Sequence, residues 1–251
     1  MSKVTTRLNN QDIVNLTKQR YESQQRSKLP SIIVDLPSAG KIYPEHHALH
    51  SGKIEMRYMT AYDEDILTNI SYIKEGVVFD KLLQSIIVTD IDVNEIAAAD
   101  KEGLLISARI LAYGSDYPVK VTNPKTNQVL DRIVDLTKIK FKSFDLIADA
   151  NGEFTYAETD RIIKFSYLVE STESQTVSET LKAVITQVDE SRSPEDIEYF
   201  IRYEFLSADA KRFRTFYKEN MPGLDFDYEF EGENGGTFTA KFPISTDFFW
   251  F

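Results

Sequence analysis

Three histidines stand close together in the sequence, in the pattern His46-His47-x-x-His50. Imidazoles four residues apart can share a metal ion when they lie on one face of a helix. This segment, however, follows a proline and precedes Ser51-Gly52, so the sequence predicts a loop rather than a helix. We therefore predict no metal site here. We interpret the three side chains as solvated, or one of them as packed against the rest of the protein.

A second candidate metal site is the acidic segment Asp90-x-Asp92-x-Asn94, which begins like a calcium-binding loop. The sixth position of such a loop requires glycine for its sharp turn, and the twelfth requires a bidentate glutamate. Glu95 and Lys101 occupy these two positions. The sequence therefore predicts turn and helix-capping roles for these acids instead of a calcium site.

The usual residues of nucleophilic catalysis are also missing from the sequence. The chain has no cysteine, which excludes thiolate nucleophiles, disulfides and cysteine-ligated zinc. It shows no nucleophile-elbow pattern, and Gly232, Gly235 and Gly236 belong to a hairpin turn rather than to a phosphate-binding loop. With 40 acidic residues, the sequence leaves open a carboxylate-based hydrolase, but no pattern identifies any of these residues as catalytic. We predict a protein without enzymatic activity, catalytic residues or cofactor.

The charge of the chain restricts its class of partner. The formal net charge of −11 argues against binding to nucleic acid or to an anionic membrane, because both need a positive field. Six basic and two acidic residues give residues 1–28 a net charge of +4, which leaves about −15 for the remainder. The sequence shows neither an apolar run of about 20 residues nor a signal-peptide pattern. We expect it to fold in the cytoplasm and to bind proteins.

Residues 1–28 form a polar segment with few apolar side chains. One interpretation is a frayed and solvated terminus, which is the usual fate of such sequences. The other is an arm that becomes ordered on a partner, with Ile13 and Leu16 on one face of a short helix.

The C-terminus ends in four consecutive aromatic residues, Phe248, Phe249, Trp250 and Phe251. In a strand their side chains alternate between two faces, so all four cannot face one side. One interpretation is a terminal strand that is buried on both faces. The other is an anchor that inserts into another protein, because large aromatic side chains dominate binding hot spots. Our hypothesis is that these four residues, together with Ile13 and Leu16, bind partner proteins.

Alternation of apolar and polar residues predicts several short strands. They are expected around residues 32–34, 54–58, 139–141 and 163–169. Turn sequences at 123–127 and 232–236 predict two β-hairpins, which span residues 117–136 and 226–242.

Apolar residues three and four apart predict helices in the rest of the chain. They are expected at residues 60–76, 82–87, 100–114, 177–188, 193–205 and 207–222. Thr60, Asp100, Ser193 and Ser207 are the predicted N-caps, and Pro194 strengthens the third of these starts. Together the elements predict the α+β class, with helical segments in the middle and late chain interrupted by antiparallel hairpins.

Composition divides the chain into a polar flexible arm, residues 1–28, and a mixed α+β body, residues 29–251. The body has two possible halves, 29–138 and 139–251, each containing a hairpin. No internal repeat of fixed period is present in the sequence.

Four stretches together resemble one protein family. They are Leu36-Pro-Ser-Ala-Gly-Lys-Ile-Tyr-Pro44, Ile54-Glu-Met-Arg-Tyr-Met-Thr-Ala-Tyr-Asp-Glu-Asp-Ile-Leu67, Ala108-Arg-Ile-Leu-Ala-Tyr-Gly-Ser-Asp-Tyr117 and Thr246-Asp-Phe-Phe-Trp-Phe251. In this order they are similar to the baseplate hub and hub-assembly proteins of T-even-type contractile-tailed phages. The resemblance extends from about Pro30 to the C-terminus, with little contribution from residues 139–190.

The resemblance implies a non-enzymatic role in the central region of the baseplate, either as a structural subunit or as an assembly chaperone that the finished particle lacks. The partners it implies are other baseplate or tail proteins, and a homo-oligomer is also possible. It places the chain in the host cytoplasm during assembly, and in the virion tail baseplate if the chain is a subunit. Two alternatives stay open: a carboxylate-based hydrolase with an unrecognised site, and an adaptor domain outside any virus.

Members of this family often carry a Cys-x-x-Cys pair in each of two hairpins, which suits a shared zinc ion. The matching positions here are Asn123 and Thr126 in one hairpin, and Gly232 and Gly235 in the other, so the resemblance carries no zinc site over. We predict that the two hairpins pack together without metal. The residues expected to hold them together are Val121, Val129, Phe230 and Phe238.

Overall fold

The structure, a computed structural model of the 251-residue chain, describes residues 29–168, 176–232, 236–241 and 246–249. Ile13 and Leu16, with the rest of the arm, lie outside the described residues, as do Trp250 and Phe251. The described chain is an α+β protein in which helices accompany small antiparallel sheets, as the sequence predicts. None of its helices is long and apolar enough to cross a membrane.

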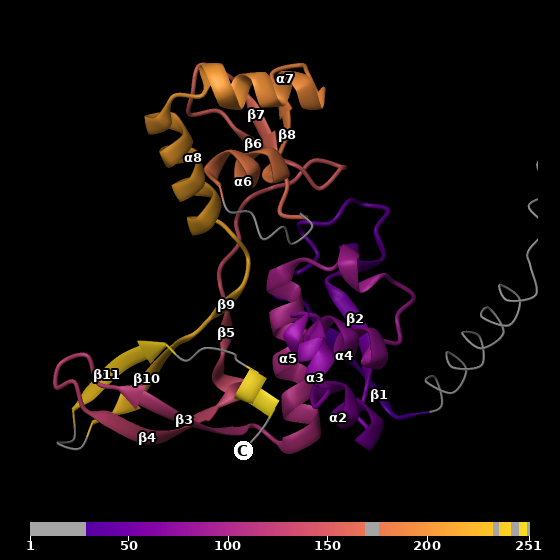
Figure 1. Cartoon of the computed structure of the whole chain (residues 1–251), viewed down its shortest axis with the longest axis vertical. Helices are drawn as coiled ribbons and strands as arrows, with labels where there is room; N and C mark the ends of the chain where they lie inside the picture. The colour runs from indigo at the N-terminus through magenta and orange to yellow at the C-terminus, as the bar shows by residue number, and fades with distance from the viewer. Residues whose placement is uncertain (1–28, 169–175, 233–235, 242–245, 250–251) are drawn as a thin grey trace, which may run out of the picture.

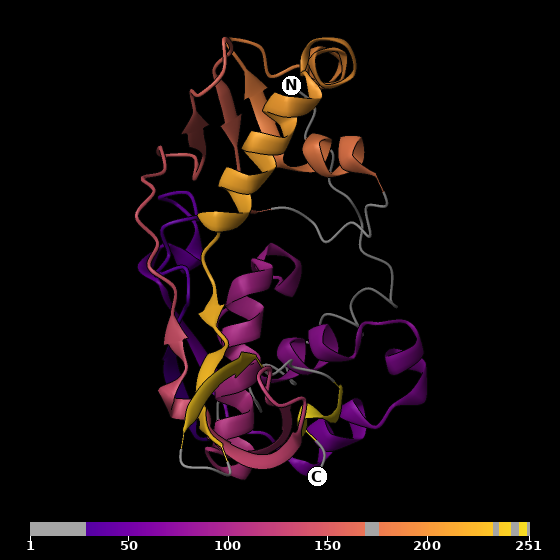
Figure 2. The ribbon, with the colours of Figure 1, turned by 90° about the vertical axis from the view of Figure 1, so that its left-hand side faces the viewer.

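The described residues form two lobes that lie one above the other in Figure 1. The first lobe comprises the described parts of 29–139 and 226–249, and the second lobe comprises those of 142–223. They are joined by a neck in which β5 (Lys140–Phe141) pairs antiparallel with β9 (Leu224–Asp225). The chain therefore leaves the first lobe and returns to it through adjacent strands, so the second lobe is an insertion between the two hairpins (Figure 2).

The first lobe begins with a two-stranded antiparallel sheet, in which Ile33 pairs with Glu55. Its elements are β1 (Ser31–Asp35) and β2 (Lys53–Arg57), with the 3-10 helix η1 (Ala48–Ser51) between them. In the turn after β1, Gly40 has a φ of +79°, and a Cβ atom there would lie 2.2 Å from the carbonyl oxygen of His50. The turn therefore requires glycine, both for its left-handed backbone and for this close approach.

Helices follow the sheet and pack beside it. They are α2 (Ala61–Leu67), α3 (Ile70–Lys74), α4 (Val78–Ile86), the 3-10 helix η2 (Val93–Glu95) and α5 (Ala98–Tyr113). Thr60 is the N-cap of α2, as predicted. The single helix predicted up to Gly76 is wrong, because the Asn69 side chain accepts hydrogen bonds from two backbone N–H groups and starts α3 as a separate helix.

Both predicted hairpins are present and belong to the first lobe. The first joins β3 (Asp116–Thr122) to β4 (Val129–Asp135), and the second joins β10 (Asp227–Glu231) to β11 (Thr237–Lys241). The hairpins lie side by side at the bottom of Figure 1, and β11 contacts β3. The 3-10 helix η3 (Leu136–Lys138) follows β4, and η5 (Thr246–Phe249) ends the described chain.

The second lobe packs helices against a three-stranded antiparallel sheet (Figure 1). Its elements are β6 (Phe154–Tyr156), β7 (Ile163–Phe165), α6 (Val177–Val184), β8 (Ile185–Val188), α7 (Pro194–Tyr199), the π-helix η4 (Phe200–Glu204) and α8 (Ser207–Glu219). Its interior combines aliphatic side chains with many aromatic ones. The aromatic residues include Phe144, Phe154, Tyr156, Phe165, Tyr167, Phe200, Phe213, Phe216 and Tyr217.

Two predictions for the second lobe are wrong in detail. Val188 lies in β8 instead of the predicted helix, because residues 185–188 pair with β7 and leave the helical conformation at Ile185. Leu206, not Ser207, is the N-cap of α8, and no side-chain hydrogen bond caps this helix. In contrast, Ser193 caps α7 and Pro194 occupies its first turn, as predicted.

The lobes also touch beside the neck. The Lys41 ammonium donates to the carbonyl oxygen of Phe144 at 2.7 Å, and the backbone N–H of Glu45 donates to that of Ala150 at 3.3 Å. Gly152 has a φ of +74°, and a Cβ atom there would lie 2.7 Å from the carbonyl oxygen of Ile42. The loop of residues 41–45 therefore supports the base of the second lobe.

Candidate functional site: buried polar clusters and exposed surfaces

A buried carboxylate fastens the 36–44 motif to α5. Asp100 is fully buried in the first turn of α5, whose N-cap is Ala97, so the predicted capping role of Asp100 is wrong. Its carboxylate accepts hydrogen bonds from the backbone N–H of Ser38 at 2.8 Å, from the Ser38 hydroxyl at 2.7 Å and from the Tyr43 hydroxyl at 2.7 Å. Burial raises the pKa of Asp100, and burial with the neighbouring carboxylate raises the pKa of Tyr43.

A second buried cluster links β2 to α2 and α4. The two guanidinium nitrogens of Arg57 donate to the two carboxylate oxygens of Asp63 at 2.7 and 2.8 Å, and the Ser85 hydroxyl donates to Asp63 at 2.7 Å. Burial alone would raise the pKa of Asp63, but the hydrogen bonds from Arg57 and Ser85 hold it below its usual value. The pair is bidentate, so it fixes the orientation of α2 relative to the sheet.

A buried arginine holds the end of the chain. Arg109 in α5 is fully buried, and its Nε donates to the carbonyl oxygen of Phe248 at 3.1 Å while Nη1 donates to that of Gly114 at 3.1 Å. The guanidinium carbon lies 5.0 Å from the ring centroid of Tyr113 and 5.9 Å from that of Tyr117. Burial lowers the pKa of Arg109, and Tyr113 and Tyr117 counter this effect in part.

Phe248 and Phe249 both lie in the core of the first lobe. Their rings meet edge to face at 5.4 Å, Phe248 lies 4.9 Å from Tyr117, and Phe249 lies 6.0 Å from Phe79. They stand in a 3-10 helix, so they share one interior, whereas a strand would have pointed them to opposite faces. For these two residues the geometry matches the core interpretation. Partner binding by the terminal residues stays a prediction.

The histidine segment forms a loop with one 3-10 turn, as its composition predicts. His47 caps η1 through Nδ1 and stacks on Tyr43 at 4.7 Å, whereas His46 is exposed. Asp92 caps η2, in agreement with the predicted capping role. Within the described ranges, no group of three or more His, Asp or Glu side chains is placed to hold a metal ion. The metal-free state stays a prediction.

The hairpins pack together through three of the four predicted residues. Val121, Phe230 and Phe238 are buried. Val129 is 62 % exposed, so the prediction that it helps to hold the hairpins together is wrong. Val129 stands opposite Thr122, and its neighbour Leu130 occupies the interior instead, because adjacent residues of a strand face opposite sides. Arg132 also donates to the carbonyl oxygen of Glu231, from Nε at 2.9 Å and from Nη2 at 2.7 Å.

The turns of the two hairpins meet at Asn123 and Gly232, two of the four positions that were compared with cysteines in the sequence analysis. A Cβ atom built on Gly232 would lie 3.7 Å from the amide nitrogen of the Asn123 side chain. Asn123 is buried, and its side-chain oxygen accepts a hydrogen bond from the backbone N–H of Lys125 at 2.9 Å. Gly235 lies outside the described residues. Here the turn is therefore stabilised by an amide side chain.

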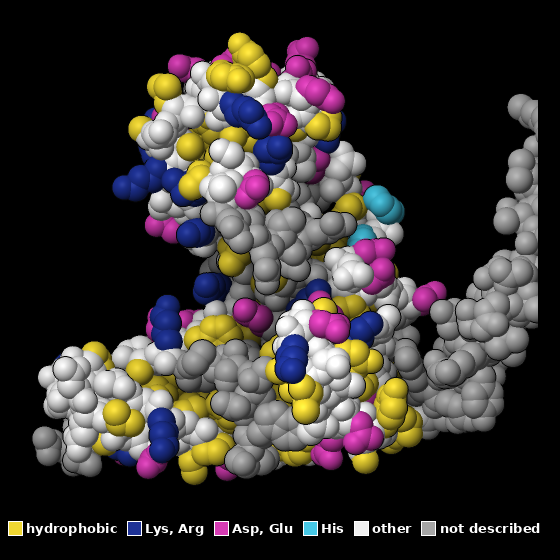
Figure 3. Space-filling view, viewed as in Figure 1, with side chains coloured by type: hydrophobic (Ala, Val, Ile, Leu, Met, Phe, Trp, Pro, Cys, Tyr) yellow, Lys and Arg dark blue, Asp and Glu magenta, His cyan; other side chains and the backbone are white. Residues whose placement is uncertain are grey.

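Two surfaces of the described chain gather exposed apolar side chains (Figure 3). One lies over α7 and the π-helix, where Tyr199, Tyr203 and Leu206 are exposed. The other surrounds a groove of about 850 Å³ between α2, α3 and α4, where Tyr62 and Ile70 are exposed. Exposed apolar groups that lie together are candidates for contact with other proteins.

The family model for the T4 bacteriophage base plate protein matches residues 29–250. The chain belongs to this family. The match covers both lobes and leaves out the N-terminal arm. Searches of curated proteins and of solved structures gave no match. As a T4-type base plate protein, the chain is a component of the phage tail baseplate and contacts other baseplate or tail proteins. The resemblance to T4-type phage baseplate proteins is therefore confirmed, and the assignment to the baseplate hub stays a prediction.

Sequence reasoning missed the roles of the buried charges in this base plate protein. Arg57, Asp63, Asp100 and Arg109 are buried polar anchors, but nothing in the spacing along the chain separates them from the many solvated charges. A signal was available for Arg109, because it stands among apolar residues of a helix that is buried on most of its surface. The exposed tyrosines of the π-helix carried no such signal.

Proposed function

We propose that this protein acts without catalysis, through contacts with other tail proteins, either as a component of the baseplate hub or as a chaperone of hub assembly. Membership of the base plate family and the exposed aromatic surface of the second lobe support this proposal. The buried charged residues that the structure describes are engaged within the fold. They are Arg57, Asp63, Asp100, Arg109 and Glu153, which pairs with Arg192 at 2.7 Å.

The observation that carries the proposal is the tyrosine patch, defined as Tyr199, Tyr203 and Leu206. Tyr203 is 70 % exposed, and its ring lies 5.1 Å from that of Tyr199. The π-helix ends beside it, where the backbone N–H of Phe205 donates to the carbonyl oxygen of Phe200 at 2.8 Å. π-Turns are rare and frequently occur at functional sites, and tyrosine is enriched among the residues that contribute most to binding.

The rim of the tyrosine patch is acidic, which limits the chemistry of its partner. A groove of about 480 Å³ runs beside Tyr199 and is lined by Asp189, Glu190 and Glu204. Arg161 is paired with Asp189 at 2.6 Å and also contacts Glu204. The surface therefore suits an apolar segment of a tail protein that has basic residues at its edge.

The double substitution Tyr199→Ser with Tyr203→Ser tests this surface. We expect the variant to fold as the wild type does, because both rings are exposed, and to lose at least ten-fold of its incorporation into baseplate intermediates. Ile147→Ser is the matched control, because Ile147 is 91 % exposed and does not belong to the tyrosine patch. Equal incorporation of the double variant and the control would refute the role of the patch.

Finished tails separate the two roles in the proposal. A structural subunit gives a fixed copy number in purified tails, measured by quantitative mass spectrometry. A chaperone is present in assembly intermediates and absent from finished tails. Absence from both would contradict the proposed function as a whole.

A further inference from the structure

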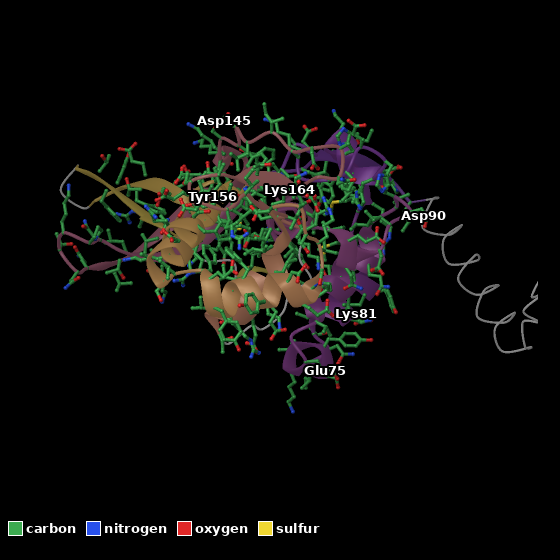
Figure 4. All side chains as sticks on the ribbon, turned by 90° about the horizontal axis from the view of Figure 1, so that it is seen from above. Glu75, Lys81, Asp90, Asp145, Tyr156 and Lys164 are labelled. Carbon is green, nitrogen blue, oxygen red and sulfur yellow. The ribbon has the colours of Figure 1, made fainter. Side chains whose placement is uncertain are left out.

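The groove of the first lobe has the composition of a docking site for an amphipathic segment. Its volume is about 850 Å³, and its lining includes the buried side chains of Ile66, Ile87 and Val93. Tyr62, which is 67 % exposed, also lines it. Polar groups complete the lining, among them Asp65 and Asp90. Figure 4 labels two residues of the groove lining, Lys81 on the side of the molecule opposite Asp145 and Asp90 at its right-hand edge.

The charge around this groove complements one segment of the same chain. Residues 61–95, which include its lining, contain eight acidic and two basic residues, for a net charge of −6. Arg57 pairs with Asp63 and Lys101 pairs with Asp80, which leaves a net charge of −4 around the groove. Residues 1–28 carry +4. The two segments therefore attract each other, and the arm offers Ile13 and Leu16 for the apolar lining.

The arm also joins the body beside the groove. The carbonyl oxygen of Pro30 accepts a hydrogen bond from the backbone N–H of Tyr58 at 3.0 Å. The next element after Tyr58 is α2, which supplies Tyr62 and Asp65 to the groove. The stretch between Leu16 and Leu29 can span about 40 Å when extended, so it lets Leu16 fold back toward α2.

We propose that the N-terminal arm of the same chain lies in this groove, with Ile13 and Leu16 on its apolar lining and the basic residues of the arm near its acidic walls. The short tether favours this arrangement over binding of a second copy, because it gives the arm a millimolar effective concentration at its own groove. In this arrangement the arm packs against the exposed ring of Tyr62.

Pairs of introduced cysteines in the full-length chain test the proposal. The wild type has no cysteine, so any disulfide within the chain joins the two introduced thiols. Thr17→Cys places a thiol next to Leu16, and Val88→Cys places one in the groove lining. The control pair joins Thr17→Cys to Lys53→Cys, on an exposed residue of β2 that the arm can reach but that lies outside the groove. With oxidised glutathione, we expect the groove pair to form an intramolecular disulfide at least ten-fold faster than the control pair.

The attraction and the apolar contact are tested separately in the same assay. High salt and Leu16→Asp should each slow the groove disulfide several-fold, whereas Val14→Asp should not, because Val14 lies away from the Ile13–Leu16 face of a helix. If Val88→Cys impairs folding, as judged by near-ultraviolet circular dichroism, the exposed Lys81→Cys replaces it. Equal rates for the groove and control pairs would overturn the proposal, as would disulfide-linked dimers or cross-linking that requires another baseplate protein.

Discussion

The two lobes bury different kinds of side chain. The first lobe has a largely aliphatic core that encloses charged groups, namely the Arg57–Asp63 pair, Asp100 and Arg109. The second lobe has a core rich in aromatic side chains, in which Tyr167 lies 4.6 Å from Tyr217 and 5.3 Å from Phe154. The buried charged residue described in the second lobe, Glu153, pairs with the half-exposed Arg192, and other ion pairs of this lobe, such as Lys182–Glu198, are partly exposed.

This difference indicates different tolerance to change. A buried charge is stable only while all of its partners keep their geometry, so the first lobe depends on segments that are far apart in sequence. Ring–ring packing needs no charged partner, and exposed ion pairs contribute little to stability. We infer that substitution of a charged residue costs more stability in the first lobe than in the second lobe.

The largest expected effect is that of Arg57→Met. It leaves the Asp63 carboxylate buried without its cation and should lower the free energy of unfolding by about 3–5 kcal/mol, measured by urea denaturation. The double variant Arg57→Met with Asp63→Leu should recover part of this loss, because it removes the unpaired charge. A loss below about 1 kcal/mol would mean that the first lobe does not depend on its buried pair.

The next effect concerns the end of the chain. Phe248→Ala should cost about 3 kcal/mol, because it removes a fully buried ring from beside Tyr117 and Arg109. Phe141→Ala is the control, since Phe141 is 48 % exposed, and it should cost much less. Unchanged folding together with lost baseplate assembly would contradict the core role and support the predicted anchor.

Two carboxylates of the first lobe should respond to pH in opposite directions. The pKa of Asp63 is lowered from its ordinary 3.8, so its contribution to stability is present above about pH 3.8 and is lost as the pH falls through its folded value. The pKa of Asp100 is raised, so its contribution is present below about pH 3.8 and is lost as the pH rises through its folded value. We expect the free energy of unfolding of Asp63→Asn, measured by urea denaturation, to fall less steeply than that of the wild type as the pH decreases below 3.8.

The same titration identifies the contribution of Asp100. The cost of Asp100→Asn relative to the wild type should shrink as the pH rises above 3.8, because the wild type must then bury a charged carboxylate. A cost that grows with pH would show that the three donors around Asp100 outweigh its burial.

The smallest expected effect is that of Lys182→Ala in the second lobe. Lys182 contacts Glu198 at 3.0 Å on the surface, where solvent screens the pair. The midpoint of urea denaturation should stay close to that of the wild type. A clear loss of stability would contradict the inference that charged residues contribute less to stability in the second lobe than in the first lobe.

Much of the local structure was predictable, because its causes are local. The turns at 123–127 and 232–236 specify both hairpins, and Ser193-Pro194 specifies the start of α7. These signals lie within a few residues of the structure that they produce.

The arrangement of the lobes was not predictable, because it depends on pairing between distant segments. The neck joins Phe141 to Leu224, two residues with no shared local signal. The same reason explains the errors at Asp100 and Val188. The spacing around Asp100 fits an N-cap, but its carboxylate accepts hydrogen bonds from Ser38 and Tyr43 instead. Val188 lies in a strand because it pairs with β7. The apolar alternation that placed Val129 in the interior was one residue out of register.

The most direct test of this account is the distribution of the chain in infected cells. Baseplate assembly intermediates and finished tails would be separated by sedimentation, and the chain would be quantified in each by mass spectrometry, for the wild type and for the Tyr199→Ser, Tyr203→Ser double variant. The account predicts that the wild-type chain sediments with baseplate intermediates and that the double variant stays with free protein. A wild-type chain that never sediments with tail proteins would contradict it.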